Sequence, residues 1–123
     1  MPPDETDAAY LWDMLQAARE VQVFVAGRTQ EDYVLDRLLQ AAVERKIEII
    51  GEAARRISSG FQAAHPAIPW RPIMAQRHVL AHDYGQIDHE RIWRVVSVHI
   101  PELIDLLVPL IPAEPPEPDS DES

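Results

Sequence analysis

The feature that most constrains the fold is a long stretch without proline, from Thr29 to Ser58, in which apolar residues recur at helical spacing. Side chains three or four positions apart lie on one face of an α-helix. Thr29 fits the N-cap, and Glu31 and Asp32 place acids in the first turn, where the helix dipole favours negative charge. The stretch predicts one helix of about 28 residues, whose apolar positions include Leu35, Leu38, Leu39, Ala42, Ala53 and Ile57.

This predicted helix is apolar on more than one side. Ile47, Ile49 and Ile50 occupy different faces, as they would if the helix packed both within a bundle and against a second copy of the chain. Gly51 is unfavourable in a helix interior unless another backbone comes close. We therefore expect this helix to be the spine of the fold, closely packed at the glycine.

The segments just before and just after this predicted helix also have clear sequence patterns. A stripe of apolar residues predicts a helix over residues 7–26, which Gly27 ends. The stripe consists of Leu11, Leu15, Ala18 and Val25. Two prolines within residues 60–69 predict an irregular loop there.

Prolines also divide the second half of the chain. Pro72 suits the first turn of a third helix, which ends near Gly85. Asp88 is the expected cap of a fourth helix. Pro101 must kink or restart that helix before a last apolar segment over residues 103–107.

Strand patterns and internal repeats are absent, and 123 residues suffice for one domain with one core. We expect an all-α fold, an antiparallel bundle of four to five helices. The tail, residues 113–123, is rich in proline and acid, and we expect it to be disordered. The expected organisation is a flexible N-terminus over residues 1–6, a helical domain over residues 7–112, and this tail.

Charge limits what the chain can bind. The formal net charge is −10, but the tail carries five acids without a base, and Asp4, Glu5 and Asp7 add three more. The remaining thirteen acids stand against eleven bases, ten of which are arginine. This balance excludes a broad basic groove for nucleic acid, whereas it permits a compact phosphate site lined by arginine.

No feature of the sequence indicates secretion or membrane insertion. Cysteine is absent, which excludes disulfides and thiol chemistry. The acidic N-terminus is unlike a signal peptide, and prolines and acids interrupt the apolar stretch from Ile100 to Ile111. We expect a cytoplasmic protein without a membrane span.

The stretch with the most usable chemistry runs from Arg77 to Tyr84 and also contains His78 and His82. Arginine binds phosphate oxygens through two nitrogens, and histidine exchanges protons near neutral pH, so these residue types predict phosphate chemistry. On an ideal helix, however, Arg77 and His82 lie about 140° apart. A distorted helix end or a site shared by two chains would bring them together; a solvated surface helix is the alternative.

A metal site is a weaker interpretation of the same stretch. His78 and His82 are four residues apart, but no third ligand lies near them in the sequence. We therefore expect neither a metal nor a cofactor. Structural or solvent-facing positions are expected for the other histidines, His65, His89 and His99. Core or interface positions are expected for the three tryptophans, Trp12, Trp70 and Trp93.

Five landmarks follow one another along the chain. They are Tyr10-Leu11-Trp12-Asp13-Met14, the run from Arg45 to Ala54, Pro66-Ala67-Ile68-Pro69-Trp70, the run from Arg77 to Tyr84, and Ile92-Trp93 with Ile100-Pro101-Glu102-Leu103. In this order they make residues 7–110 resemble the HepT-like proteins, or DUF86, of the HEPN superfamily. The fourth landmark fits the family motif R-x4-H-x-Y.

The resemblance implies an HEPN bundle that forms homodimers or larger homo-oligomers, with the motifs of two chains facing a composite cleft. It also implies a metal-independent endoribonuclease that is the toxin of a type VII toxin–antitoxin system. The implied partner is a minimal, MntA-like nucleotidyltransferase antitoxin, which adenylylates the motif tyrosine and so inactivates the toxin.

Carried over by position, the resemblance makes Arg77 and His82 the catalytic pair and Tyr84 the adenylylated residue. His78 stands where family members commonly have asparagine, and it would orient the substrate or share in proton transfer. The RNA 2′-hydroxyl would attack the neighbouring phosphorus, so DNA would not be a substrate. Two alternatives stay open: a non-catalytic HEPN partner that helps a nucleotidyltransferase bind its substrate, and an oligomeric scaffold.

Overall fold

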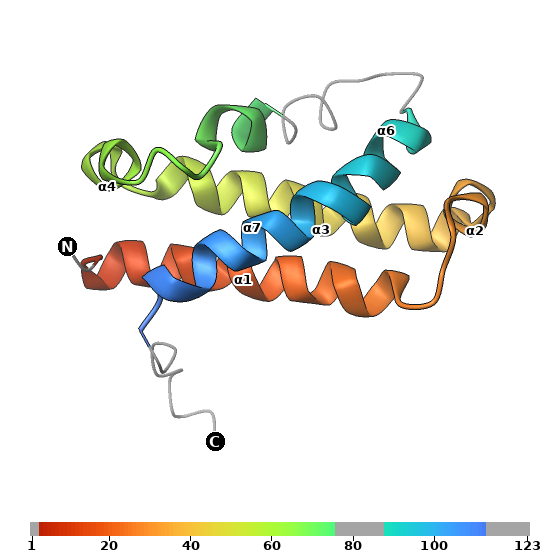
Figure 1. Ribbon diagram of the computed structural model, residues 1–123, viewed down its shortest axis with the longest axis horizontal. Coiled ribbons are helices and arrows are strands. Elements are labelled where there is room, and N and C mark those ends of the chain that lie inside the picture. Colours follow the sequence, from red (N-terminus) through yellow and green to blue (C-terminus); the bar gives the residue numbers. More distant parts are fainter. Residues whose placement is uncertain (1–2, 76–87, 113–123) are drawn as a thin grey trace.

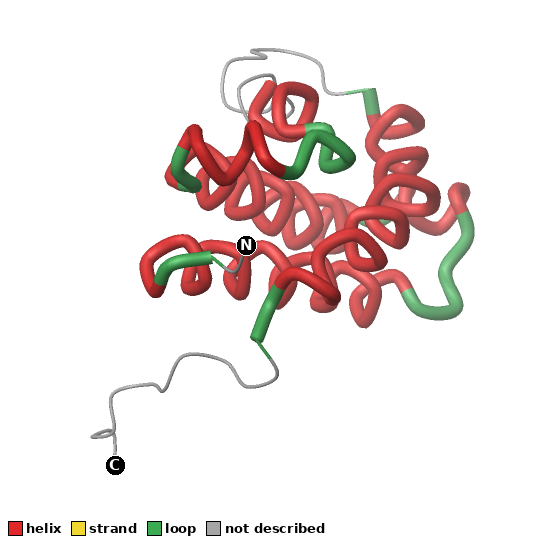
Figure 2. Tube along the Cα trace, turned by 60° about the vertical axis from the view of Figure 1, so that its left-hand side comes forward, coloured by secondary structure: helices red, strands yellow, loops and turns green. Residues whose placement is uncertain are grey.

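The computed structural model of the protein describes residues 3–75 and 88–112. Within them, all regular structure is helical, as expected (Figure 2). Two long helices, α1 (Glu5–Val25) and α3 (Arg37–Arg56), run side by side in opposite directions (Figure 1). Two short helices, α2 (Gln30–Leu35) and α4 (Ser59–Ala64), lie at opposite ends of α3.

The later part of the chain packs across this helix pair. Residues 70–75 form a helical segment beside α3, and the chain then returns along the bundle (Figure 1). The returning part consists of α6 (His89–Arg94), a π-helical turn η1 (Val95–His99), α7 (Ile100–Leu107) and a 3-10 turn η2 (Val108–Leu110). The prediction of an all-α antiparallel bundle is confirmed.

The helix changes its hydrogen-bond pattern just before Pro101, which has no N–H to donate. The π-helical turn directly precedes α7, and Pro101 occupies the first turn of α7, where the missing N–H needs no partner. The apolar residues Leu103 and Leu107 then face the core and are buried. The predicted interruption and the predicted final apolar segment are both confirmed.

The core forms where α1, α3 and α7 meet. Leu11 and Val21 of α1, Val43 of α3 and Leu107 of α7 are completely buried. Burying each such side chain contributes about 1.5–3 kcal/mol to folding. Gly27 adopts a left-handed backbone angle of φ 75° just beyond α1, which explains why glycine ends this helix.

The first helix begins slightly earlier than residue 7, the predicted start. The side chain of Asp4 accepts a hydrogen bond of 2.7 Å from the backbone N–H of Asp7, and so caps α1. None of the helices in the described part of the chain is long and apolar enough to cross a membrane.

The single long helix predicted from Thr29 to Ser58 is wrong, because the chain breaks at Asp36. This residue has extended backbone angles, and its carboxylate accepts a hydrogen bond of 3.0 Å from the N–H of Leu39. A side chain that caps a new helix in this way competes with continuation of the previous one. The break leaves Leu35 75% exposed and Leu38 81% exposed, although both belong to the predicted apolar stripe.

The irregular loop predicted over residues 60–69 is only partly correct. Its first residues belong to α4, which Ser58 caps by accepting a hydrogen bond of 3.2 Å from the N–H of Phe61. Phe61 is buried in the core, which stabilises the short helix by tertiary packing. The irregular connection is confined to the residues between α4 and the helical segment at 70–75.

Candidate functional site

The four site residues predicted from the sequence all lie outside the described residues. Arg77, His78, His82 and Tyr84 fall between residue 75 and residue 88. Their mutual geometry, including the predicted angle between Arg77 and His82, therefore stays a prediction. What the structure describes are the two points at which the bundle holds this segment of the chain.

The entry to the segment is held by a buried tryptophan. Trp70 is buried, and its indole N–H donates a hydrogen bond of 3.0 Å to the carbonyl oxygen of His65. Its ring stands edge-on to Phe61, with centroids 6.5 Å apart. Ile68, just before it, is also buried. The helical segment at 70–75, which leads to Arg77, is thus anchored on α4 and the core.

The exit from the segment is held by a helix cap. The carboxylate of Asp88 accepts hydrogen bonds of 3.1 Å from the N–H groups of Glu90 and Arg91, as the sequence predicts for this residue. One turn later, Ile92 is buried in the core. The chain therefore re-enters the bundle at a defined place, four residues after Tyr84.

A half-buried polar cluster lies beside this exit, where α2, α3 and α6 meet. His89 Nδ1 lies 3.7 Å from Glu44 Oε2. The ring of Tyr33, which is completely buried, stands edge-on to the His89 ring with centroids 6.1 Å apart. Trp93 packs against the same tyrosine at 5.6 Å. Sequence reasoning did not find this cluster, because no spacing pattern links residues from three separate helices.

Burial changes the acidity of two members of the cluster. It raises the pKa of Tyr33, and the nearby charge of Glu44 raises it further, so the hydroxyl keeps its proton. Burial also raises the pKa of Glu44, while His89 opposes this effect and Glu48 adds to it. Perturbed groups of this kind gather at functional sites and also in structural networks.

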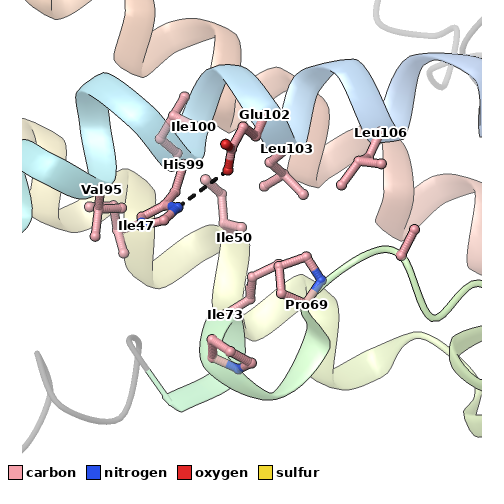
Figure 3. Close-up of a pocket in the computed structure, with 12 residues that line it drawn as sticks. Ile47, Ile50, Pro69, Ile73, Val95, His99, Ile100, Glu102, Leu103 and Leu106 are labelled. Atoms are coloured by element: carbon pink, nitrogen blue, oxygen red, sulfur yellow. Dashed lines mark hydrogen bonds and ion pairs between the residues drawn. The ribbon is translucent and has the colours of Figure 1, made fainter.

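An apolar groove lies between residues 67–73, α3 and the η1–α7 region (Figure 3). Its volume is about 400 Å³. Ile47, Ile50 and Leu103 contribute to its apolar walls. His99 and Glu102 lie at its rim, with 3.4 Å between Nδ1 and Oε1 (Figure 3). Periodicity alone could not have located this groove, since its walls come from three parts of the chain.

The other histidines and the tryptophans noted in the sequence have structural or solvent-exposed positions. His65 stacks on Phe61 with ring centroids 4.2 Å apart, and His99 is exposed. Trp70 is buried, and Trp12 and Trp93 are half-buried against the core, as expected. In residues 3–75 and 88–112, no three side chains of the metal-binding types come together.

Comparison with known proteins identifies the family. A model described as ribonuclease HepT-like matches residues 14–110. "Probable ribonuclease HepT" of Thermococcus cleftensis is 38% identical over 94 residues, which cover 76% of this chain and 86% of the relative. "Putative RNase MJ1380" of Methanocaldococcus jannaschii is 33% identical over 95 residues, with 77% and 87% covered. "Putative RNase TTE0752" of Caldanaerobacter subterraneus is 35% identical over 99 residues, with 80% and 88% covered.

No solved structure matches the chain significantly. The family match nevertheless extends from the middle of α1 to the end of η2 and includes the run from Arg77 to Tyr84. The relatives named above are covered over most of their own length. The chain therefore belongs to the ribonuclease HepT-like family.

Proposed function

We propose that this protein is a metal-independent endoribonuclease that acts through its R-x4-H-x-Y motif. The observation that carries the proposal is the family match over residues 14–110, which contains the whole run from Arg77 to Tyr84. Ribonuclease names among the relatives support the same activity. The anchors at Trp70 and Asp88 support it further, because a site is most effective when rigid elements hold it.

The proposed reaction is cleavage by the RNA's own 2′-hydroxyl. A base removes the 2′-hydroxyl proton, the oxygen attacks the neighbouring phosphorus, and an acid protonates the departing 5′-oxygen. His82 moves one of these protons, and Arg77 neutralises the charge that develops on the phosphoryl oxygens. His78 orients the substrate. The products are a 2′,3′-cyclic phosphate and a 5′-hydroxyl end.

The proposed biological setting is a type VII toxin–antitoxin system in the cytoplasm. In it, the protein is the toxin and forms a homodimer or a larger homo-oligomer. The helical domain over residues 7–112 carries the activity, between a flexible N-terminus and an acidic tail. A nucleotidyltransferase antitoxin adenylylates Tyr84, which adds bulk and negative charge beside the site and so repels RNA.

The net charge of −10 favours a second candidate, since phosphate binding usually rests on an excess of positive charge. This candidate is a non-catalytic HEPN partner that helps a nucleotidyltransferase bind its substrate. Such a partner would leave RNA uncut whatever residue occupies position 82.

One substrate tests the proposed reaction directly. An end-labelled RNA with a mapped cleavage position is compared with the same RNA carrying a single 2′-deoxy nucleotide at that position, with EDTA in both reactions. We expect the unmodified RNA to be cut, leaving a cyclic phosphate, and the 2′-deoxy RNA to stay intact at that position. Cleavage at the 2′-deoxy position would rule out attack by the 2′-hydroxyl.

A further inference from the structure

Three polar atoms are sealed from solvent at the junction of α2, α3 and α6, without a hydrogen-bond partner among the residues that the structure describes. They are Tyr33 Oη, Glu44 Oε2 and His89 Nδ1. Buried polar atoms nearly always have partners, because leaving them unpaired is costly. Two of them, Glu44 Oε2 and His89 Nδ1, lie near each other and indicate a direct interaction.

The geometry shows which interaction this is. His89 Nδ1 lies 3.7 Å from Glu44 Oε2, which is within ion-pair range and too long for a hydrogen bond. A shift of about 1 Å would bring the two atoms to the usual separation of a charge-assisted hydrogen bond. The Tyr33 ring packs edge-on to the His89 ring, and Glu44 Oε2 and His89 Nδ1 are both shielded from solvent, which strengthens a polar interaction between them.

The position of the pair connects it to the proposed site. His89 follows Asp88, the cap of α6, and these are the first described residues after the segment that contains Arg77 and His82. Glu44 lies in the middle of α3, the spine of the bundle. Whatever holds His89 against Glu44 therefore determines where that segment rejoins the bundle.

We infer that His89 donates its Nδ1–H to the Glu44 carboxylate, and that this pair is a latch that positions the segment carrying Arg77 and His82. His89 is thus a positioning residue for the reaction and not a catalytic one. This role rests on the proposed ribonuclease activity, whereas the latch itself is a property of the folded chain.

The latch depends on the charge of Glu44. Besides each other, the titratable groups that face the pair among the described residues are Tyr33 on α2 and Glu48 on α3. Burial raises the pKa of Glu44, with His89 opposing the shift and Glu48 adding to it, so the carboxylate is lost as pH falls through that raised value. The latch therefore weakens as pH falls.

Hydrogen exchange tests the latch without any need for activity. Protection factors of the α6 amides are compared in wild type, His89→Ala and His89→Gln, in which the glutamine amide can still donate to Glu44. We expect about tenfold lower protection in His89→Ala, with recovery in His89→Gln and no change in α1. His99→Ala, which removes an exposed histidine 3.4 Å from its own glutamate, should behave as wild type. Unchanged α6 protection in His89→Ala would overturn the latch.

RNA cleavage by the same proteins tests the positioning role. We expect His89→Ala to lower kcat about tenfold or more with KM changed less than twofold, and His89→Gln to restore most of kcat. Full kcat in a His89→Ala protein that has lost α6 protection would overturn the positioning role. A wild type that cuts no RNA would instead overturn the proposed ribonuclease activity.

Discussion

The buried carboxylate of Asp7 accepts two hydrogen bonds from Ser58, one of 2.9 Å from its backbone N–H and one of 2.6 Å from its hydroxyl. The same hydroxyl oxygen accepts the N–H of Phe61 and so caps α4. Two side chains thereby join the start of α1 to the turn between α3 and α4. That turn leads, through Trp70, to the segment that contains the motif.

Replacement of Asp7 by asparagine should destabilise the protein. The amide offers one acceptor oxygen in place of two, so the charge-assisted hydrogen bond from the hydroxyl is lost. We expect the free energy of unfolding to fall by about 1.5–3 kcal/mol in urea titrations. Asp13→Asn, on an exposed position of the same helix, should change it by less than about 0.5 kcal/mol. Equal effects of the two substitutions would contradict the account.

Glu44→Gln should change how stability depends on pH. Because burial raises the pKa of Glu44, the folded protein keeps a proton that the unfolded chain has already lost. Wild type should therefore lose stability relative to Glu44→Gln as pH rises above the ordinary glutamate pKa of about 4.3. Urea unfolding of both proteins across this rise in pH gives the difference, and a constant or opposite difference would contradict the raised pKa.

Tyr84→Phe should separate cleavage from neutralisation. If Tyr84 is only the acceptor of the adenylyl group, removing its hydroxyl leaves kcat/KM for RNA within about fivefold of wild type, or about 1 kcal/mol of transition-state stabilisation. Intact mass after incubation with the transferase and ATP should show no added adenylyl group, and the variant should stay active. Loss of cleavage in the unmodified variant would instead give Tyr84 a direct catalytic role.

Arg77→Ala and His82→Ala should keep the oligomeric state of wild type. Groups that touch RNA leave the assembly unchanged when they are removed, whereas groups that hold an oligomer together do not. Size-exclusion chromatography with light scattering measures the state at several concentrations. Dissociation of both variants would favour the scaffold interpretation over the ribonuclease.

Helix starts are predictable from this sequence where a cap residue precedes an apolar pattern. The Thr29 hydroxyl accepts the N–H of Asp32 at 3.1 Å, and the Asp32 carboxylate accepts the N–H of Thr29 at 2.9 Å. Asp88 caps α6 in a similar way. In each case the signal is local, because a short polar side chain satisfies N–H groups within three residues of itself.

The break at Asp36 escapes the same reasoning, because one extended residue leaves the apolar spacing almost unchanged. Leu35 and Leu38 continue the stripe in the sequence and nevertheless face solvent. The available sequence signal was Asp36 itself, since an aspartate three residues before Leu39 fits an N-cap. In the structure, Arg28 also pairs with the Asp36 carboxylate at 3.2 Å.

The candidate site also has one part that the sequence predicts and one part that it does not. Arg77, His82 and Tyr84 are recognisable from residue type, spacing and family resemblance. The contact between Glu44 and His89 has no sequence signal, because the two residues lie on different helices and meet only when the bundle closes. Local chemistry can be predicted from this chain, whereas the contacts that position it depend on the packing of α2, α3 and α6.

The central claim is tested most directly by incubating end-labelled RNA, in EDTA, with partner-free protein shown by intact mass to be unmodified. Wild type, His82→Ala and the control His99→Ala are compared. The account predicts that wild type and His99→Ala cut RNA and leave cyclic-phosphate ends, with His82→Ala slower by about 10²-fold to 10⁴-fold. Equal cutting by His82→Ala, or no cutting by wild type, would contradict it.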